Sequence, residues 1–301
     1  MEQLDSIILN YNKTTVLIVN ISLAFIMVGV AMGLTVQDFK NIVFQGKPLL
    51  VGLLSQFILL PFLTFLLIVL LKPIPSIALG MMMVAACPGG IISNFITSLA
   101  NGNAALSISL TAVSSLVAII MTPVNLGFWG SIYEPTASIL QTINLDIFDV
   151  FITIFLILGV PLMTGMTIRN YYPKFTAKAQ PVMRVLSIFI FFMIVIGIFV
   201  GNLDNFFDYI HYIILIVFLH NAVALFSGFQ LANVFGLSIA DRRSLAIETG
   251  IQNSGLGLLL IITFFGGMGG MALVAAWWGI WHIVTGLAIG FFWGSRKISV
   301  K

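Results

Sequence analysis

The chain has 301 residues, of which 60% are hydrophobic and only 8% are charged, and its formal net charge is +3. An ordinary soluble domain carries about 25% charged residues. This composition excludes a water-soluble enzyme, a nucleic-acid-binding protein and a disordered chain. The single cysteine, Cys87, cannot form an internal disulfide.

Apolar stretches recur along the whole chain, each close to the roughly 20 residues that a helix needs to cross a bilayer. The pattern predicts an all-α polytopic membrane protein with nine transmembrane helices, forming a single unit over residues 1–301. The predicted spans are Thr15–Leu34, Leu49–Leu71, Ser76–Ala100, Asn103–Phe128, Ile147–Ile168, Val182–Gly201, Tyr209–Phe235, Arg243–Phe265 and Gly270–Gly294. The residues before the first span lack the basic start and short apolar core of a cleaved signal, so we expect them to be retained.

Lysine and arginine residues gather on one side of this predicted topology. Eleven of the 13 lie on the side of the C-terminus: Lys40, Lys47, Arg169, Lys174, Lys178, Arg184, Arg242, Arg243, Arg296, Lys297 and Lys301. Only Lys13 and Lys72 lie on the other side. Because positively charged loops resist translocation, we expect a multi-pass protein of the cell (inner) membrane, with its N-terminus outside and its C-terminus in the cytoplasm.

Two of the predicted spans contain residues that interrupt a helix. The third carries Cys87-Pro88-Gly89-Gly90, where proline removes a backbone donor and the glycines loosen the remaining helix. The eighth carries a polar octet at 248–255, Glu-Thr-Gly-Ile-Gln-Asn-Ser-Gly, which is too polar for contact with lipid. We therefore expect both helices to break near the middle of the membrane.

The two interruptions have similar sequences, Gly90-Ile91-Ile92-Ser93-Asn94 and Gly250-Ile251-Gln252-Asn253-Ser254. They lie five predicted spans apart, and an odd offset means that the two helices run in opposite directions. This arrangement is typical of an inverted repeat, which would pair spans one to four with spans six to nine and leave span five as the connector. Two unrelated glycine-rich kinks are the alternative.

Glu248 is the one acidic residue inside a predicted span; the other nine lie in loops or at span ends. An acid at this depth costs about 2.5–3.5 kcal/mol, so it needs a partner or a use. No lysine or arginine occupies the middle of any predicted span, which excludes a salt bridge there. A bound cation and a protonated glutamate hydrogen-bonded to its neighbours are the two remaining interpretations.

Oxygen-bearing side chains near the interruptions favour the cation. Hard cations are bound by carboxylate, amide and hydroxyl oxygens and by carbonyls that an unwound helix releases. The candidate ligands are Gln56, Ser93, Asn94, Ser107, Thr111, Glu248, Gln252 and the carbonyls of Thr249 and Ile251. Ser107 and Thr111 are four residues apart and share one helical face. Each hydroxyl taken alone would more often bond to its own helix.

These motifs resemble the bile acid:sodium symporter family. The matching segments are Cys87–Asn94 with Asn101–Ser107, Leu219–Val223 with Gly228-Phe229, Glu248–Leu256, Trp281-His282, and Met32–Thr35 with Asp38-Phe39. The resemblance covers nearly the whole chain after residue 15. It is to a bacterial-type member with nine spans, although many bacterial relatives carry one more span at the N-terminus and nine is the count of the animal members.

The resemblance implies a core of six helices packed against a smaller panel, with substrate entering between them. The panel would comprise residues 15–45 and 147–201, and the core residues 46–128 and 209–295. It also implies two sodium ions. The first would be held by Ser93, Asn94, Ser107, Thr111 and Glu248, and the second by Gln56, Glu248, Gln252 and the carbonyls of Thr249 and Ile251.

Four residues are candidates for binding the substrate: Gly90, Ile91, Asn253 and His282. Backbone donors at the half-helix ends near Gly90 would suit an anion. Family members resembling this chain place small polar residues where it has Ile91 and Ile92, and the greasier pocket argues against bile acids themselves. Packing in the core is the alternative role for His282, and the preferred role for the pair His220-Asn221.

Two sodium ions beside one carboxylate leave a net charge of +1, which a monoanion would neutralise. We expect a secondary active transporter, not an enzyme, that symports sodium and an organic anion by alternating access. The anion would be a monocarboxylate or a bile-acid-like amphipathic acid. The alternative is a proton-coupled exchanger or carboxylate transporter in which Glu248 carries the proton; a sensor or structural protein also stays open.

Overall fold

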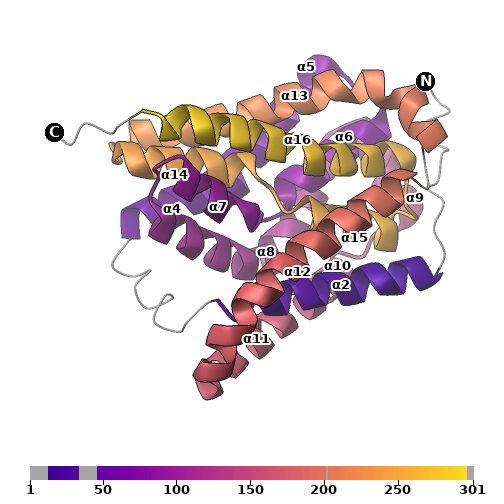
Figure 1. Cartoon of the computed structure of the whole chain (residues 1–301). Coiled ribbons are helices and arrows are strands. Elements are labelled where there is room, and N and C mark those ends of the chain that lie inside the picture. The colour runs from indigo at the N-terminus through magenta and orange to yellow at the C-terminus, as the bar shows by residue number, and fades with distance from the viewer. Residues whose placement is uncertain (1–12, 34–45, 201–202, 297–301) are drawn as a thin grey trace.

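The computed structural model describes residues 13–33, 46–200 and 203–296, and this part of the chain is helical apart from short connections (Figure 1). The elements are α2 (Lys13–Ala31), α4 (Gly46–Leu54), η1 (Ser55–Leu59), α5 (Leu60–Leu71), α6 (Pro75–Ala86), α7 (Ile92–Leu99), α8 (Ala104–Ile132), α9 (Glu134–Ile143), α10 (Ile147–Ile154), η2 (Phe155–Gly159), α11 (Val160–Tyr171), α12 (Pro173–Val200), α13 (Leu203–Val234), α14 (Ile239–Gly250), α15 (Ser254–Phe264) and α16 (Gly269–Gly294). The predicted span ends at Leu34 and Gly201, the loop at 35–45 and the tail from residue 297 lie outside the described residues.

Among the described residues, five helical stretches are long and apolar enough to cross a membrane, judged by length and composition. They are Gly46–Leu71, Ala104–Ile132, Ile147–Tyr171, Ile213–Val234 and Gly269–Gly294. Helices α2 and α12 lie at the predicted first and sixth spans, and the pairs α6–α7 and α14–α15 lie at the third and eighth. The architecture is that of an all-helical polytopic membrane protein, whereas the total of nine spans stays a prediction.

The predicted third span is interrupted at its proline. Helix α6 ends at Ala86 and α7 begins at Ile92. Cys87 has an extended backbone, with φ −72° and ψ 158°, because a following proline disfavours the helical conformation of the residue before it. Pro88 therefore ends α6 at Ala86, two residues before the proline.

The predicted eighth span is also interrupted, but over a shorter stretch than the polar octet suggested. Helix α14 ends at Gly250 and α15 begins at Ser254. Glu248 and Thr249 thus belong to the last turn of α14 rather than to unwound chain. The Asn253 side chain accepts a hydrogen bond from the backbone N–H of Leu256 and caps the start of α15.

Several helix boundaries differ from the prediction. Residues 173–181, predicted as a loop, form the start of α12, and α14 begins at Ile239 instead of Arg243. Helix α9 lies in a segment where no helix was predicted. In α12 and α14 the helix extends beyond the apolar stretch into polar sequence, whereas α9 is a separate helix that begins after the extended residue Tyr133.

Two of the long helices contain a π-helical turn that ends just before a proline: η1 precedes Pro61 and η2 precedes Pro161. A proline inside a helix has no N–H to donate and clashes with the carbonyl four residues earlier, which is Phe57 for Pro61. Asn125 on α8 donates its Nδ2 to the Phe57 carbonyl at 3.0 Å. The neighbouring helix thereby satisfies the group that the proline leaves unbonded.

The helices form two groups. Helices α2, α11 and α12 pack against one another in the lower part of Figure 1, whereas α13 and α16 lie along its upper edge. Contacts of α10 and η2 with α8, and of α2 with α15, join the two groups. The broken helices α6–α7 and α14–α15 belong to the upper group, where α6 packs on α16 and α14 packs on α13.

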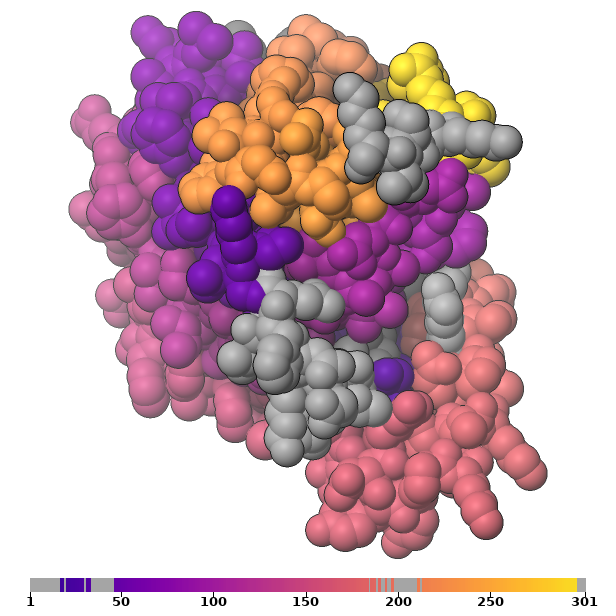
Figure 2. Space-filling model, turned by 90° about the vertical axis from the view of Figure 1, so that its left-hand side faces the viewer, coloured from indigo at the N-terminus to yellow at the C-terminus, as the bar shows by residue number. Residues whose placement is uncertain are grey.

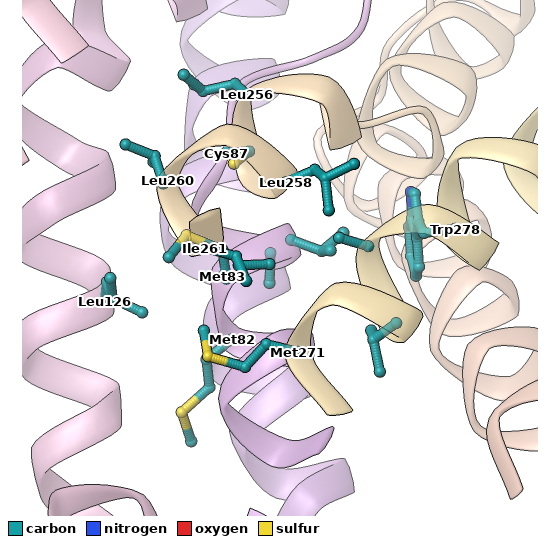
Figure 3. Close-up of a cluster of buried hydrophobic side chains, with 14 of the residues drawn as sticks. Met82, Met83, Cys87, Leu126, Leu256, Leu258, Leu260, Ile261, Met271 and Trp278 are labelled. Atoms are coloured by element: carbon teal, nitrogen blue, oxygen red, sulfur yellow. The ribbon is translucent and has the colours of Figure 1, made fainter. Parts of the chain in front are cut away.

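The largest apolar cluster lies where α6, α8, α15 and α16 meet (Figure 3). Its labelled members, none more than 3% exposed, are Met82, Met83, Cys87, Leu126, Leu256, Leu258, Leu260, Ile261, Met271 and Trp278. Gly80 allows α16 to approach α6 here, because a Cβ at this position would lie 2.8 Å from the Met271 Cα. Close packing of small residues is the main source of helix association inside a bilayer.

A buried arginine joins three helix ends on another face of the molecule. Arg243, 5% exposed, donates its Nη1 to the carbonyls of Ala100 at 2.7 Å and Trp293 at 3.1 Å. Terminal carbonyls of a helix have no partner within it, so one guanidinium satisfies the ends of α7 and α16. Figure 2 shows this face, where the start of α14 (orange), the chain near residue 100 (magenta) and the end of α16 (yellow) lie together.

Replacing Asn125 with leucine should destabilise the protein by about 1–3 kcal/mol, because the Phe57 carbonyl is left buried without a donor. The measurement is the unfolding temperature of the purified protein in detergent. Asn233→Leu, at an exposed position of α13, is the control and should change little. In a Pro61→Ala background a backbone N–H becomes available to Phe57, so the cost of Asn125→Leu should fall; an equal cost in both backgrounds would contradict the account.

Candidate functional site

The two interruptions cross and pair with each other as antiparallel extended chain. The Gly90 N–H donates to the Ile251 carbonyl at 2.7 Å, and the Asn253 N–H donates to the Pro88 carbonyl at 2.8 Å. Backbone groups in an apolar interior must be bonded within the protein. The crossing meets this requirement because each broken helix supplies the partners of the other.

Two glycines allow this close approach. A Cβ at Gly89 would lie 2.6 Å from Oε1 of Glu248 and 2.9 Å from Nε2 of Gln56. A Cβ at Gly90 would lie 2.9 Å from the carbonyl oxygen of Gln252. The first interruption therefore presents bare backbone to the carboxylate, and no larger residue fits there without displacing it.

Glu248 is 1% exposed and its carboxylate accepts three hydrogen bonds from hydroxyl groups. Ser93 and Ser107 donate to Oε2 at 2.7 and 2.9 Å, and Thr111 donates to Oε1 at 2.7 Å. The donors come from α7 and α8, whereas the acid comes from α14. These partners are neutral, so the negative charge is held by dipoles alone.

Asn94 completes this cluster. Its Oδ1 lies 2.9 Å from the Ser107 hydroxyl and 3.3 Å from the Thr111 hydroxyl. The five residues predicted for the first ion therefore lie together, and they present six side-chain oxygens: two from Glu248 and one from each of the others. Three hydroxyl protons are shared among these six oxygens. Such an excess of lone pairs over protons is the donor set that a hard cation prefers.

Two buried amide side chains bond backbone carbonyls in the last turn of α14. Gln56 donates its Nε2 to the Glu248 carbonyl at 3.3 Å, and Gln252 donates its Nε2 to the Thr249 carbonyl at 2.8 Å. Both glutamines are 0% exposed, and within the described residues the Oε1 atom of each has no hydrogen-bond partner. Buried oxygens of this kind are rare and require an explanation.

The carbonyls predicted as ligands of a second ion are already hydrogen-bonded. The Thr249 carbonyl accepts from Gln252, and the Ile251 carbonyl accepts from the Gly90 N–H. The expectation that breaking the helix leaves these oxygens free is wrong, because the crossing segment bonds one of them and a side chain bonds the other. Each carbonyl retains a second lone pair.

Sequence reasoning did not single out Ser55, and assigned Asn221 only a bracing role. The Ser55 hydroxyl lies 2.8 Å from the Thr249 hydroxyl, and Asn221 donates its Nδ2 to the Gly250 carbonyl at 2.7 Å. The sequence could have indicated Ser55, because it lies next to Gln56 in a largely apolar span. The neighbour His220 does brace the core, through a 2.7 Å bond between its Nε2 and the Thr64 hydroxyl.

The four candidate substrate residues have different environments. The Gly90 N–H donates to the Ile251 carbonyl, so Gly90 does not offer the backbone donor that was expected for an anion. Ile91 and Asn253 are half-buried at the crossing. His282 lies on α16 and is 3% exposed, and its Nδ1 has no hydrogen-bond partner in the part of the chain that the structure describes.

The fold and its centre define a polytopic membrane protein that keeps a carboxylate among neutral oxygens at the crossing of two broken helices. Residues 20–209 match the profile of the sodium bile acid symporter family. The match covers more than half of the chain, and the chain belongs to this family.

Relatives from bacteria, plants and animals support the assignment. The chain is 30% identical over 283 residues to an uncharacterized sodium-dependent transporter, YocS, of Bacillus subtilis, which covers 94% of this chain and 84% of that protein. It is 30% identical over 248 residues to BASS1 of Arabidopsis thaliana, a probable chloroplastic sodium/metabolite cotransporter, covering 82% of this chain and 59% of the plant protein. It is also 30% identical over 228 residues to the mouse P3 protein, covering 75% of this chain and 46% of that protein.

Gly89→Ala should destabilise the protein by about 1–3 kcal/mol, the usual cost of overpacking a well-filled site, because the new Cβ overlaps the Glu248 carboxylate. Gly257→Ala in α15 is the matched control. Its Cβ would make ordinary contacts with Cys87 Sγ at 3.4 Å and Met83 Cγ at 3.7 Å, and alanine favours a helix. The unfolding temperature should therefore fall for Gly89→Ala and hold or rise for Gly257→Ala; the opposite order would contradict the described crossing.

Proposed function

We propose that the protein is a secondary active transporter that couples the entry of sodium to the movement of an organic anion. The observation that carries this proposal is the cluster at Glu248, where six side-chain oxygens share three hydroxyl protons. Membership of the family and the printed names of the relatives, sodium-dependent transporter and sodium/metabolite cotransporter, support the choice of sodium.

The first sodium ion would bind among Ser93, Asn94, Ser107, Thr111 and Glu248. On binding, the hydroxyls would turn their protons away and direct lone pairs to the ion. Hydrogen bonds to a charged group contribute about 1.5–3 kcal/mol each, so three of them offset the roughly 2.5–3.5 kcal/mol cost of the buried acid. The same carboxylate is therefore tolerated without an ion, as a carrier that releases its cargo requires.

The second sodium ion would bind between Glu248, Gln56 and Gln252, with the carbonyls of Thr249 and Ile251. The support is the pair of unbonded Oε1 atoms on the two glutamines. A cation would give both oxygens a partner, and each backbone carbonyl has one lone pair left for it. Bound ions at this place would join α14, the crossing and the η1 turn into one unit.

The substrate would be a monocarboxylate or a bile-acid-like amphipathic acid. Two sodium ions and one carboxylate carry a net charge of +1, which a monoanion neutralises. Asn253 retains its amide Nδ2 and His282 retains an unbonded Nδ1 as polar contacts. The apolar Ile91, half-buried at the crossing, favours an anion with an apolar body, and Gly90 would shape the site rather than donate to it.

Transport would proceed by alternating access between two groups of helices. The panel would contain α2 and α10 to α12, and the core would contain the broken helices with α4, α5, α8, α13 and α16. The inverted repeat and the placement of the N-terminus outside and the C-terminus in the cytoplasm belong to this proposal. The support is the packing of α2, α11 and α12 into their own group.

Coupling would arise from linkage between the ions and the anion. Sodium would hold the two crossing segments in one arrangement, and the anion would find a formed site only in that state. By reciprocity, sodium raises the affinity for the anion by the same factor as the anion raises the affinity for sodium.

Glu248→Gln should abolish sodium-driven uptake while leaving the fold intact, because the amide keeps the shape but removes the charge. The measurement is uptake of labelled monocarboxylates, from a short-chain acid to a bile acid, into proteoliposomes with and without an inward sodium gradient. Glu134→Gln, at an exposed glutamate of α9, is the matched control and should transport as the wild type does.

A proton-coupled carrier would behave differently in the same vesicles. Uptake driven by a pH gradient in the absence of sodium would favour the proton alternative. Equal dependence on sodium in the wild type and in Glu248→Gln would remove the carboxylate from the mechanism.

A further inference from the structure

Asn221 joins two helices at the second interruption. It lies in α13, is 1% exposed, and donates its Nδ2 to the Gly250 carbonyl at 2.7 Å. Gly250 is the last residue of α14, and the final carbonyls of a helix have no partner within the helix. In an apolar interior this carbonyl needs a donor, which Asn221 supplies.

The other end of the same side chain is bonded to α16. The Thr285 hydroxyl donates to Asn221 Oδ1 at 2.7 Å. Only one orientation of the amide satisfies both contacts, because the reverse orientation would place its oxygen against the Gly250 carbonyl. Asn221 therefore fixes the end of α14 relative to α16. Its partner on α16, Thr285, lies three residues after His282.

Glycines keep α13 close to α14 around this bond. A Cβ at Gly228 would lie 2.7 Å from the Leu245 carbonyl oxygen and 2.8 Å from the Thr249 hydroxyl, and a Cβ at Gly250 would overlap Leu225. Backbones this close prevent the last turn of α14 from shifting toward α13. The unwound segment begins directly after Gly250, and Asn221 holds the helical residue that precedes it.

The residues on either side of Gly250 are those proposed to bind the second ion. Thr249 precedes it, and Ile251 and Gln252 follow it. The Gln252 Nε2 reaches back across Gly250 to the Thr249 carbonyl at 2.8 Å. Any displacement of the Gly250 carbonyl would therefore change how these oxygens face one another.

We propose that Asn221 is a positioning residue of the second sodium site. Together with Thr285 it holds the end of α14 in the arrangement that an ion requires, and it connects that arrangement to the helix that carries His282. The proposal rests on the sodium transport proposed above. It assigns to Asn221 an effect on sodium affinity, which a brace acting only on overall stability would not have.

Sodium itself is the probe, because ion binding can be measured without the anion. The purified protein in detergent is titrated with NaCl against KCl at constant ionic strength, and the sodium-specific rise in unfolding temperature gives the half-saturating concentration. Thr285→Val removes only the hydroxyl that bonds Asn221. We expect it to raise the half-saturating sodium concentration about fivefold, the effect of losing one ordinary hydrogen bond, and Thr285→Ser to restore the wild-type value.

Thr64→Val is the matched control. Thr64 is buried on α5, and its hydroxyl bonds His220, the residue before Asn221 on α13. Its loss should lower the unfolding temperature without changing the half-saturating sodium concentration. Asn221→Ala should raise that concentration at least as much as Thr285→Val, and combining the two should add nothing further, because both break one connection.

The outcomes separate this inference from the proposed function. If the wild type responds to sodium and Glu248→Gln does not, an unchanged half-saturating concentration in Asn221→Ala and Thr285→Val overturns the role of Asn221 alone. An equal rise in Thr64→Val overturns it too, since the effect would then follow stability. No sodium-specific rise in the wild type overturns the sodium site and this inference together.

Discussion

A carboxylate in an apolar interior must be surrounded by donors or cations, and this requirement organises the centre of the protein. The hydroxyls of Ser93, Ser107 and Thr111 meet it, and they reach Glu248 from two other helices. Such convergence needs α7 to begin in the interior, beside the last turn of α14. The interruption at Pro88 creates that starting point, and Gly89 leaves the space into which the carboxylate fits.

Apolar packing and one buried arginine hold the half-helices in the surrounding fold, whereas a few hydrogen bonds connect the crossing itself. The apolar cluster of Figure 3 fixes α6 and α15 against α8 and α16, and Arg243 fixes the far ends of α7 and α16. At the crossing itself, two backbone bonds and the glutamate cluster connect the segments. The site proposed to accept and release ions thus lies where only a few hydrogen bonds connect the two segments.

Much of this centre was predictable from sequence, because its main features depend on residues that are unusual in an apolar span. Pro88 and the glycines after it mark one break, and Glu248 is conspicuous as an acid in an apolar span. The partners of individual backbone groups were not predictable: the Ile251 carbonyl is bonded by the Gly90 N–H, which only the crossing brings near, and the Thr249 carbonyl is bonded by the side chain of Gln252. The hydrogen bond at the π-helical turn before Pro61 was not predictable either, because its donor, Asn125, lies on another helix.

The central claim is that the oxygens around Glu248 bind sodium, and a pair of experimental density maps tests it most directly. Maps of the purified protein would be compared in sodium and in a buffer whose only cation is large and organic. The account predicts density between the Glu248 carboxylate and the Asn94 side-chain oxygen in sodium alone, with the three hydroxyls rotated to face it. Identical maps in both buffers, or a Glu248 side chain turned to lipid or paired with a basic residue, would contradict it.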